Sequence, residues 1–309
     1  MRAVRFDEYG DETVLEVREV PDPEPGEGEV VVRVVTAGTN PGEVGIRSGA
    51  LAERFPAVFP EGQGSDLAGV VVAVGPGVTD AAIDQRVIGL SDGRNAQAEL
   101  VLLPASRVVP KPDALDWDVA ATLYVAGTTA LALLQTVPVA AGDTVVVAGA
   151  AGGVGVFLTQ LAVRTGARVI AVAGAANHDW LRAHGAEPIA YGNGLEDRLR
   201  AAAPDGVTAF FDLFGNGYTD LAVALGVPPE RVATVADFAA GERLGVRVTG
   251  MAALEDPAAG VRSLAAIASS GGFEVPIKGR FPLEAVQDAY REVSRRSGLG
   301  KVVLQVSAP

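Results

Sequence analysis

Residues 145–155 read VVVAGAAGGVG, a short apolar run that passes directly into a segment with four glycines. The residues that follow, VFLTQLAVRTG (156–166), carry apolar side chains at helical spacing and end on a glycine. Glycine in this number indicates a flexible break, a tight turn, or bare backbone lying against a ligand. A flexible break does not fit, because the glycines join a strand-like run directly to a periodic helix.

The glycines are spaced as Gly149-x-x-Gly152-x-x-Gly155, with Gly153 as the fourth. This is a variant of the fingerprint in which the first glycine allows a tight turn and the second leaves room for a pyrophosphate. The third glycine lets the helix pack closely on the strand, and the positive end of the helix favours an anion. We therefore predict a dinucleotide site here rather than an ordinary turn.

The surrounding sequence alternates between apolar and helical segments from about residue 119 onward, whereas the first hundred residues look β-rich, as in EVVVRVV (29–35) and GVVVAVG (69–75). The alternation predicts an α/β fold with about six short strands in a parallel sheet, covered on both faces by helices. Beyond residue 250 we expect helices and strands in turn. The segments are 145–149, 156–166, 169–174, 177–185, 188–191, 195–203, 209–214, 221–225, 232–235 and 246–250, then 257–270, 274–279, 283–297 and 301–306.

Bulk properties narrow the function. The chain of 309 residues has a formal net charge of −13 and a pI of about 4.7, so we expect no nucleic-acid and no membrane-surface partner. It has no cysteine, which excludes disulfides, thiolate chemistry and sulfur-ligated metal. The charged beginning of the chain does not look like a signal peptide, and apolar runs end well short of the ~18 residues that span a bilayer. We expect a cytoplasmic protein that acts on a small molecule.

The identity of the dinucleotide depends on the end of the strand that follows the glycine helix. NAD sites place a carboxylate there, about 20 residues on, to bind the ribose hydroxyl. This chain has Gly174 in that region and no carboxylate before Asp179. His178 and Arg182, one helical turn apart, offer positive charge to a 2′-phosphate, although both also fit a solvated helix face. We predict NADPH as the cofactor.

Five further stretches occur together in a specific order. They are AGTNPGEVGIRSG (37–49), GSDLAGVVVAVGPGV (64–78), LYVAGTTALALL (123–134), AGAAGGVG (148–155) and GKVVLQV (300–306). With them the chain resembles the medium-chain dehydrogenase/reductase superfamily, and within it the zinc-free quinone oxidoreductase branch. The resemblance covers nearly the whole length. It implies a Rossmann-type doubly wound parallel sheet domain (119–250) inserted in a GroES-like, β-barrel-type substrate domain (1–118 plus 251–309), and a homodimer.

The resemblance also implies the site residues. Asn40 and Thr129 correspond to positions near the nicotinamide, and the glycine turn corresponds to the pyrophosphate site. Gly174, His178 and Tyr191 correspond to the 2′-phosphate pocket, and two later loops flank the ribose and nicotinamide. The cofactor-binding residues so implied are Asn40, Thr129, Gly149, Ala151, Gly152, Gly153, Val154, Gly155, Gly174, His178, Tyr191, Phe214, Gly215, Val235 and Ala236.

Two departures bear on the chemistry. Zinc-dependent members of the superfamily carry a ligating Cys where this chain has Asn40 and a His-Glu pair where it has Ser65-Asp66, so we expect no metal. Relatives often carry a Tyr near the substrate where this chain has Gly45, which we interpret as an opened space. Tyr124 is then a candidate proton donor, although it also fits a packed structural tyrosine. Arg47, Ser48 and water stay open as other donors.

A metal-free site favours acceptors that delocalise charge, such as a quinone or an activated C=C, over simple ketones that need a Lewis acid. We therefore predict a zinc-independent, NADPH-dependent oxidoreductase in which Asn40, Thr129 and Tyr124 are catalytic candidates. One alternative is a pathway-specific enoyl reductase in biosynthesis. Another, of a different class, is an NADPH-binding sensor or structural protein with little catalysis.

Overall fold

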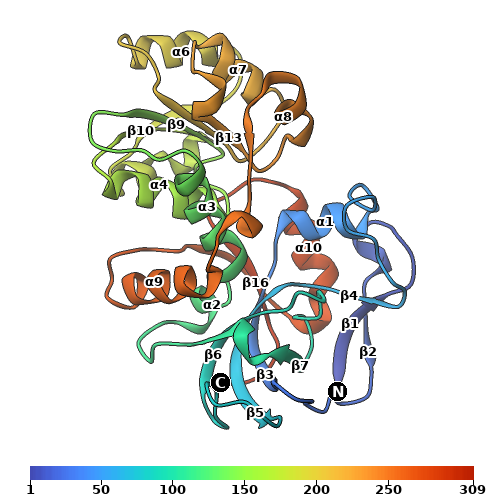
Figure 1. Cartoon of the computed structure of the whole chain (residues 1–309). Coiled ribbons are helices and arrows are strands. Elements are labelled where there is room, and N and C mark those ends of the chain that lie inside the picture. The colour runs from blue at the N-terminus through green and yellow to red at the C-terminus, as the bar shows by residue number, and fades with distance from the viewer. The chain divides into compact units, whose positions relative to one another are not determined.

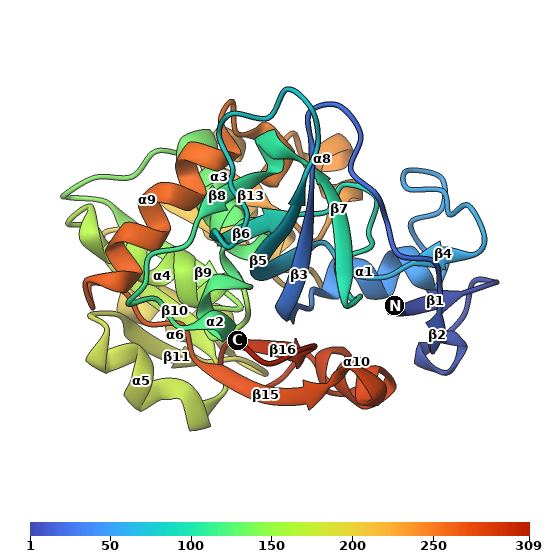
Figure 2. The ribbon, with the colours of Figure 1, turned by 90° about the horizontal axis from the view of Figure 1, so that it is seen from below.

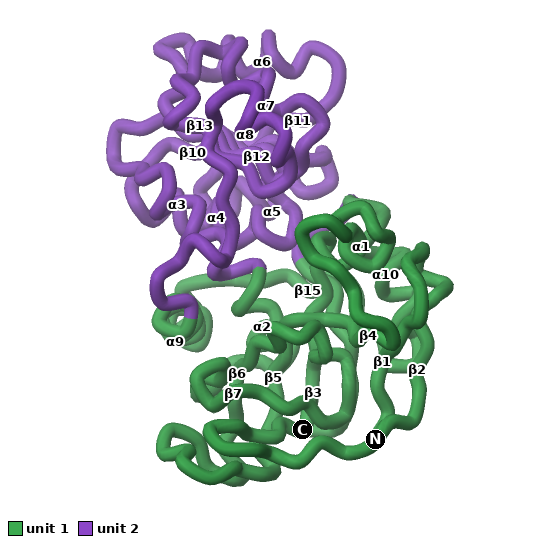
Figure 3. The backbone as a smooth tube through the Cα atoms, turned by 45° about the vertical axis from the view of Figure 1, so that its right-hand side comes forward, with its two compact units in different colours: residues 1–125, 258–296, 301–309 green, residues 126–257, 297–300 purple.

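The computed structural model describes all of residues 1–309, and the chain divides into two compact units (Figure 3). Unit 1 comprises residues 1–125, 258–296 and 301–309, and unit 2 comprises residues 126–257 and 297–300. The assignment of one domain to substrate and the other to nucleotide stays a prediction. No helix is long and apolar enough to cross a bilayer.

Unit 2 is built on a six-stranded sheet in which every neighbouring pair is parallel. The strand order is β11-β10-β9-β12-β13-β14, which, counted from β9, is the 3-2-1-4-5-6 order of dinucleotide-binding sheets. Figure 1 labels β10, β9 and β13 of this sheet. The central strands are buried almost throughout, as parallel strands covered on both faces must be. The strands are β9 (Thr144–Ala148), β10 (Arg168–Ala173), β11 (Glu187–Ala190), β12 (Ala209–Asp212), β13 (Val232–Thr234) and β14 (Arg247–Val248).

Helices cover the two faces of this sheet. Apolar side chains of α6, α7 and α8 form one buried cluster with Val146 and Ala148 of β9. Helix α4 contacts β9 and β10 as well, but it packs against α3 and its buried side chains lie outside that cluster, so it covers the other face. The helices are α3 (Thr128–Thr136), α4 (Gly155–Arg164), α5 (His178–Ala183), α6 (Leu195–Ala202), α7 (Tyr218–Ala224) and α8 (Phe238–Leu244).

One segment of the predicted alternation, residues 221–225, lies almost wholly in helix α7. The side chains that reach the core are those of Tyr218, Leu221, Ala222 and Leu225. Their spacing has the period of a helix, whereas the short run 221–225 alone does not distinguish a helix from a buried strand.

The glycine turn joins β9 to α4 as the spacing predicts. Gly149 has a φ of +84°, in the left-handed region that favours glycine. At Gly155, a Cβ atom would lie 2.2 Å from the carbonyl oxygen of Gly149 and 2.6 Å from Ala150. Helix and strand therefore approach so closely here that any side chain at position 155 would collide with backbone.

Unit 1 contains a mostly antiparallel sheet centred on β3, which pairs with β5, β7 and β16. A small three-stranded sheet, β2-β1-β4, shares its apolar core. The strands are β1 (Arg2–Phe6), β2 (Glu16–Glu19), β3 (Glu29–Gly38), β4 (Glu61–Gly62), β5 (Asp66–Val74), β6 (Arg86–Leu90), β7 (Leu100–Pro104), β8 (Val108–Pro110), β15 (Ile277–Pro282) and β16 (Lys301–Gln305).

The C-terminal part of the chain completes unit 1. Strand β16 pairs antiparallel with β3 and parallel with β15, and α10 lies against both β15 and β16 (Figure 2). The strand predicted at 274–279 begins later, at Ile277, and runs to Pro282. The helices are α1 (Pro41–Arg47), α2 (Trp117–Ala120), α9 (Pro257–Ser269) and α10 (Val286–Ser294), and a π-helical turn (Leu123–Gly127) leads into α3.

The contact at Gly155 yields a test of the fold. We expect Gly155→Ala to lower the free energy of unfolding by about 1–3 kcal/mol, because the methyl group meets backbone that has to shift. Urea denaturation measures the loss. Gly250→Ala is the matched control, since that glycine is extended and has nothing within 4 Å of its Cβ position. Equal stability of the two variants would contradict the close packing of α4 on β9.

Candidate functional site

The predicted cofactor residues of unit 2 follow the carboxyl ends of five strands. Because all strands of the sheet are parallel, these ends meet at one edge, which is where ligands bind in doubly wound sheets. The structure thus brings the predicted residues together at the same edge. They are Gly149 after β9, Gly174 after β10, Tyr191 after β11, Phe214 and Gly215 after β12, and Val235 and Ala236 after β13.

The turn after β9 presents bare backbone. The N–H of Gly152 donates to the carbonyl of Gly149 at 3.0 Å, whereas the N–H groups of Gly153 and Val154 donate to no backbone carbonyl. Ala151 is buried, and Gly152 is exposed. The turn stands at the N-terminus of α4, whose dipole favours an anion. Two free donors and a position without a side chain fit the diphosphate of a dinucleotide.

A buried carboxylate that sequence reasoning missed holds the next two loops. Asp212, fully buried at the end of β12, accepts the N–H groups of Phe214 (2.9 Å) and Gly215 (2.7 Å). Its other oxygen accepts the hydroxyl of Thr234, which in turn accepts the N–H of Ala236. The signal for Asp212 in the sequence is a carboxylate at the end of the apolar run AFFD, and it was not recognised. Asp212 couples the loops after β12 and β13.

Gly174, His178 and Tyr191 lie close together at the end of β10. A methyl group on Gly174 would lie 3.4 Å from Cε1 of Tyr191, whose side chain is 62% exposed. Nε2 of His178 lies 3.3 Å from the carbonyl oxygen of Ala173. Arg182, the second predicted cation, donates to Asp179 at 2.8 Å on the exposed face of α5. Of these two side chains, His178 is therefore the one that contacts the end of β10, whereas Arg182 is paired on its own helix.

In unit 1, Asn40 is held on three sides. Its Nδ2 donates to Asp66 (2.7 Å) and to Glu43 (3.1 Å), and its Oδ1 accepts the ammonium of Lys301 at 2.6 Å. The carboxylates and the ammonium fix which atom of the amide is nitrogen. Asn40 is only 7% exposed, and both of its amide protons are in use. The amide is therefore rigidly oriented and has no donor left for a ligand.

The network around Asn40 contains several buried ionisable groups. Burial raises the pKa of both Glu43 and Asp66 and lowers that of Lys301. Attraction between Lys301 and Asp66 opposes the shifts of these two groups, whereas repulsion from Asp66 adds to the raised pKa of Glu43. Lys301 donates in addition to the carbonyl of Thr39 at 2.7 Å, and Asp66 accepts the N–H of Val125 at 2.7 Å. The ammonium thus supplies the positive charge that two buried carboxylates need.

Tyr290 extends this network away from Asn40. Its hydroxyl donates to Glu43 at 2.6 Å and accepts Nε2 of Gln97 at 2.7 Å, and burial raises its pKa well above the ordinary value. The guanidinium of Arg47 lies over the ring, 4.9 Å from its centroid. Arg47 is 1% exposed, so it packs inside unit 1 and is unsuited as a proton donor to a substrate.

Sequence reasoning missed Glu43, Lys301, Tyr290 and Gln97. Glu43 had a signal, because Asn-x-x-Glu before an apolar helix is a capping box, and Glu43 accepts the N–H of Asn40 at 2.9 Å. Lys301 also had one, as the single charge at the start of the apolar strand KVVLQV. Tyr290 and Gln97 carry no local pattern, since they meet from segments 193 positions apart.

The remaining predicted residues divide between the units. Thr129 lies in α3 of unit 2 and is 7% exposed. Tyr124, in unit 1, is 1% exposed, and its phenol interacts with the guanidinium of Arg107. Gly45 does not open a space as the sequence suggested, because a Cβ there would lie 2.9 Å from Cδ1 of Leu51.

The donor set fits zinc poorly. No group of three or more His, Cys, Asp or Glu side chains is arranged to hold a metal ion. Of the three residues at the superfamily's zinc positions, Asn40 and Asp66 direct their polar atoms at each other and at protein donors. The ammonium of Lys301, bonded to Asn40, would also repel a divalent cation.

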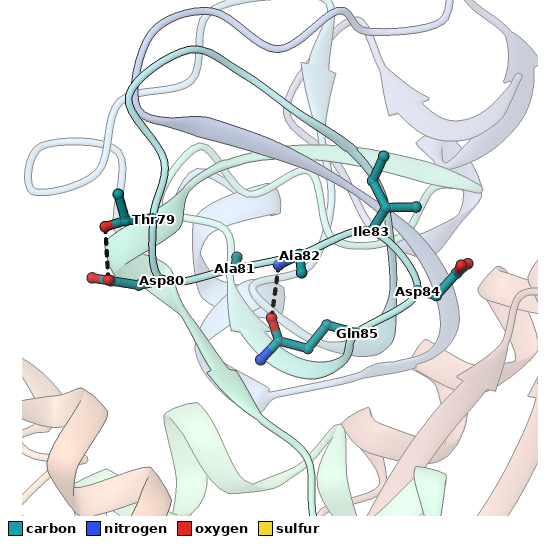
Figure 4. Close-up of a pocket in the computed structure, with 7 residues that line it drawn as sticks. All are labelled: Thr79, Asp80, Ala81, Ala82, Ile83, Asp84 and Gln85. Carbon is teal, nitrogen blue, oxygen red and sulfur yellow. Dashed lines mark hydrogen bonds between the residues drawn. The ribbon is translucent and has the colours of Figure 1, made fainter.

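A separate hollow lies in the turn between β5 and β6 of unit 1 (Figure 4). Seven consecutive residues, Thr79–Gln85, line it, and their polar side chains bond within the turn: Thr79 to Asp80, and the N–H of Ala82 to Gln85. No other segment contributes to the hollow, and no predicted site residue lies in it. It has the composition of a surface turn.

Comparison with known proteins adds to this geometry. The family description "Alcohol dehydrogenase GroES-like domain" matches residues 26–113, and "Zinc-binding dehydrogenase" matches residues 184–304. Mycobacterial Rv1454c, solved in complex with NADPH, is 30% identical, with 99% of each chain covered and a TM-score of 0.86. The chain belongs to the medium-chain dehydrogenase/reductase superfamily, in its quinone oxidoreductase branch. The predicted fold class, a Rossmann-type sheet domain with a GroES-like domain, is confirmed.

Two more relatives in this branch carry the name quinone oxidoreductase. The structure of the Coxiella burnetii protein is 28% identical, with 99% of each chain covered and a TM-score of 0.90. The rat protein is 38% identical over 176 residues, which are 56% of this chain and 53% of the rat protein. The match thus spans about half the length of such curated relatives.

The Lys301 contacts predict a pH-dependent loss of stability. Burial already makes Asp66 bind a proton more tightly in the folded than in the unfolded chain, and removing the ammonium strengthens this preference. We expect Lys301→Met to lose about 3–5 kcal/mol of unfolding free energy near pH 8. The loss should be smaller at about pH 5 than at about pH 8, because protonation of Asp66 on lowering the pH removes the uncompensated charge.

Urea denaturation at both pH values measures this difference. Lys111→Met is the matched control, because Lys111 is also buried but donates to the carbonyl of Pro112 and lies over the Trp117 ring instead of bonding a carboxylate network. An equal loss for Lys301→Met at the two pH values would show that the ammonium does not compensate the buried carboxylates.

Proposed function

We propose that the protein is an NADPH-dependent oxidoreductase that transfers hydride to a quinone or an activated C=C without zinc. The observation that carries this proposal is the glycine turn at the carboxyl edge of a 3-2-1-4-5-6 sheet, with free N–H groups at Gly153 and Val154. Membership of the quinone oxidoreductase branch supports the reaction class. The NADPH complex of the mycobacterial relative supports the coenzyme.

The residues of unit 2 fit the parts of NADPH. Gly153 and Val154 would donate to the diphosphate, and Gly152 leaves space for it. Gly174, His178 and Tyr191 would surround the adenosine ribose, where no carboxylate follows β10 to compete with a 2′-phosphate. The loop at Phe214 and Gly215, held by Asp212, would bound the opposite side of the coenzyme. When bound, NADPH supplies a hydride from its nicotinamide.

The network of unit 1 supports a reaction without a metal. The ammonium of Lys301 donates to Oδ1 of Asn40, so this network offers the fixed dipole of the Asn40 amide instead of a Lewis acid. An acceptor that spreads negative charge over a conjugated system needs only modest electrostatic stabilisation. The orientation of Asn40 leaves the second lone pair of its Oδ1, an acceptor, as its free hydrogen-bonding site. Asn40 would therefore accept from a donor such as a carboxamide NH₂ rather than protonate the substrate.

No feature of the structure favours a pocket enlarged for one bulky pathway intermediate, because Leu51 fills the space beside Gly45. Tyr124 is equally unsuited to the proton-donor role, since its phenol is buried beside Arg107. Solvent is then the simplest source of the proton that completes reduction. If solvent supplies the proton, the rate of reduction should show a solvent isotope effect, and its pH profile should show no ionisation of a protein phenol.

The reaction is tested by stopped-flow oxidation of NADPH with a panel of quinones and enones, before and after treatment with a strong chelator. We expect turnover with at least one acceptor class and no change on chelation. Gly152→Asp should weaken NADPH binding by about a hundredfold, because a carboxylate then faces the diphosphate. A Cβ at position 152 would lie 3.3 Å from the carbonyl oxygen of Gly149, which is a tight contact, so urea denaturation checks that Gly152→Asp is folded. Full activity of Gly152→Asp, or loss of activity with zinc removal, would refute the proposal.

A further inference from the structure

The loop between β11 and α6 is held by a side chain that has no role in the site so far described. Residues 191–194 connect the two elements, and two of the four are glycines with positive φ, Gly192 (+103°) and Gly194 (+73°). Such a loop has much conformational freedom of its own. Tyr191, its first residue, stands on it with a largely exposed ring.

Arg198 removes that freedom. From the first turns of α6 its side chain folds back over the loop, with Nη1 donating to the carbonyl of Asn193 at 2.7 Å. Nη2 donates to the carbonyls of Ala190 at 2.9 Å and Gly192 at 3.3 Å. The guanidinium thus bonds three of the four successive carbonyls from 190 to 193, leaving out only that of Tyr191. A planar fork with several fixed donors is suited to this task, and a single ammonium is not.

The loop matters because of where it holds the Tyr191 ring. The ring lies beside Gly174, at the end of β10, with its hydroxyl 3.9 Å from the Cβ position of that glycine. Tyr218 lies close enough to Tyr191 for the second phenol to add to the raised pKa of Tyr218, after burial and Asp212. In doubly wound sheets this edge binds the adenosine ribose of the coenzyme.

The other polar groups at this edge are less constrained. Arg182 is paired with an exposed aspartate on its own helix, and the ring of His178 has one contact at 3.3 Å. Both Nη atoms of Arg198 are engaged by the carbonyls of the loop, and its Nε is buried, so the guanidinium is not itself free to bind a phosphate. On these contacts we propose that Arg198 is the positioning residue for the adenosine end of the site: it fixes Tyr191 so that the phenol meets a 2′-phosphate, and so favours NADPH over NADH. This inference rests on the proposed NADPH site.

The proposal is tested by binding rather than turnover, with NADPH, NADH and adenosine 2′,5′-bisphosphate as calorimetric probes of the full chain. We expect Arg198→Met to weaken NADPH and the bisphosphate by about tenfold, the size of a lost hydrogen bond to a charged group. NADH, which has no 2′-phosphate, should change less than about threefold on the same reasoning. Arg198→Lys should behave like Arg198→Met, because one ammonium cannot span three carbonyls.

A double-mutant cycle identifies the route of the effect. Tyr191→Phe should weaken the same two probes, and adding Arg198→Met to it should have little further effect, because both changes remove one interaction. Arg200→Met is the matched control: Arg200 lies on the same helix and bonds Glu196 and the carbonyl of Ala224, away from the loop. It should leave all three affinities unchanged. Exchange of the backbone amide hydrogens of residues 191–194 should be faster in Arg198→Met than in the wild-type protein, and unchanged in Tyr191→Phe and Arg200→Met.

Three outcomes with the variants overturn the inference. Wild-type affinity in Arg198→Lys would show that the positive charge alone is sufficient. Additive effects of Arg198→Met and Tyr191→Phe would show that Arg198 acts independently of the phenol. An equal loss of affinity for NADPH and NADH in Arg198→Met would show a general structural role. Binding of all probes by the wild-type protein without any hydride transfer would refute the proposed function and leave this inference intact. Failure of the wild-type protein to bind NADPH would overturn both.

Discussion

The site depends on one geometric constraint, which is the close approach of α4 to β9. A Cβ at position 155 would lie 2.2 Å from the carbonyl oxygen of Gly149, so any residue other than glycine there forces the turn between strand and helix to shift. That approach sets the N-terminus of α4 at the edge of the sheet and leaves the N–H groups of Gly153 and Val154 without a backbone acceptor. N–H groups at a helix N-terminus need an acceptor from outside the helix, and an anionic ligand supplies one.

The same edge is built from loops that side chains, rather than metal or disulfide, hold in place. Asp212 accepts two backbone N–H groups from the loop after β12, and Arg198 donates to three carbonyls of the loop after β11. One anchor offers only acceptors and the other only donors, so each matches the backbone groups that its loop leaves unpaired. Rigid loops around a ligand reduce the entropy lost on binding.

Sequence patterns were sufficient for the α/β architecture and for the strand–turn–helix unit, because both depend on residues close in sequence. The helix of 221–225 was not assigned, since five apolar residues fit a strand as well as a helix. Contacts across large sequence separations were invisible for a different reason. The bond between Tyr290 and Gln97, and that between Lys301 and Asn40, arise only when β16 and α10 join the N-terminal sheet. The open space expected at Gly45 is wrong for the same reason, because the contact between Gly45 and the side chain of Leu51 forms only when the chain folds.

Lys301 gives a physical reason why this chain can differ from zinc-dependent members of its superfamily without disordering the site. A metal ion there would supply positive charge to a buried carboxylate at position 66. Here the ammonium does so, and it also fixes the amide of Asn40 at 2.6 Å. An ammonium has no open coordination position for an alkoxide, so in the proposed reaction this network provides positive charge but no Lewis acid. The acceptors that we propose are therefore those whose own conjugation stabilises the charge that hydride brings.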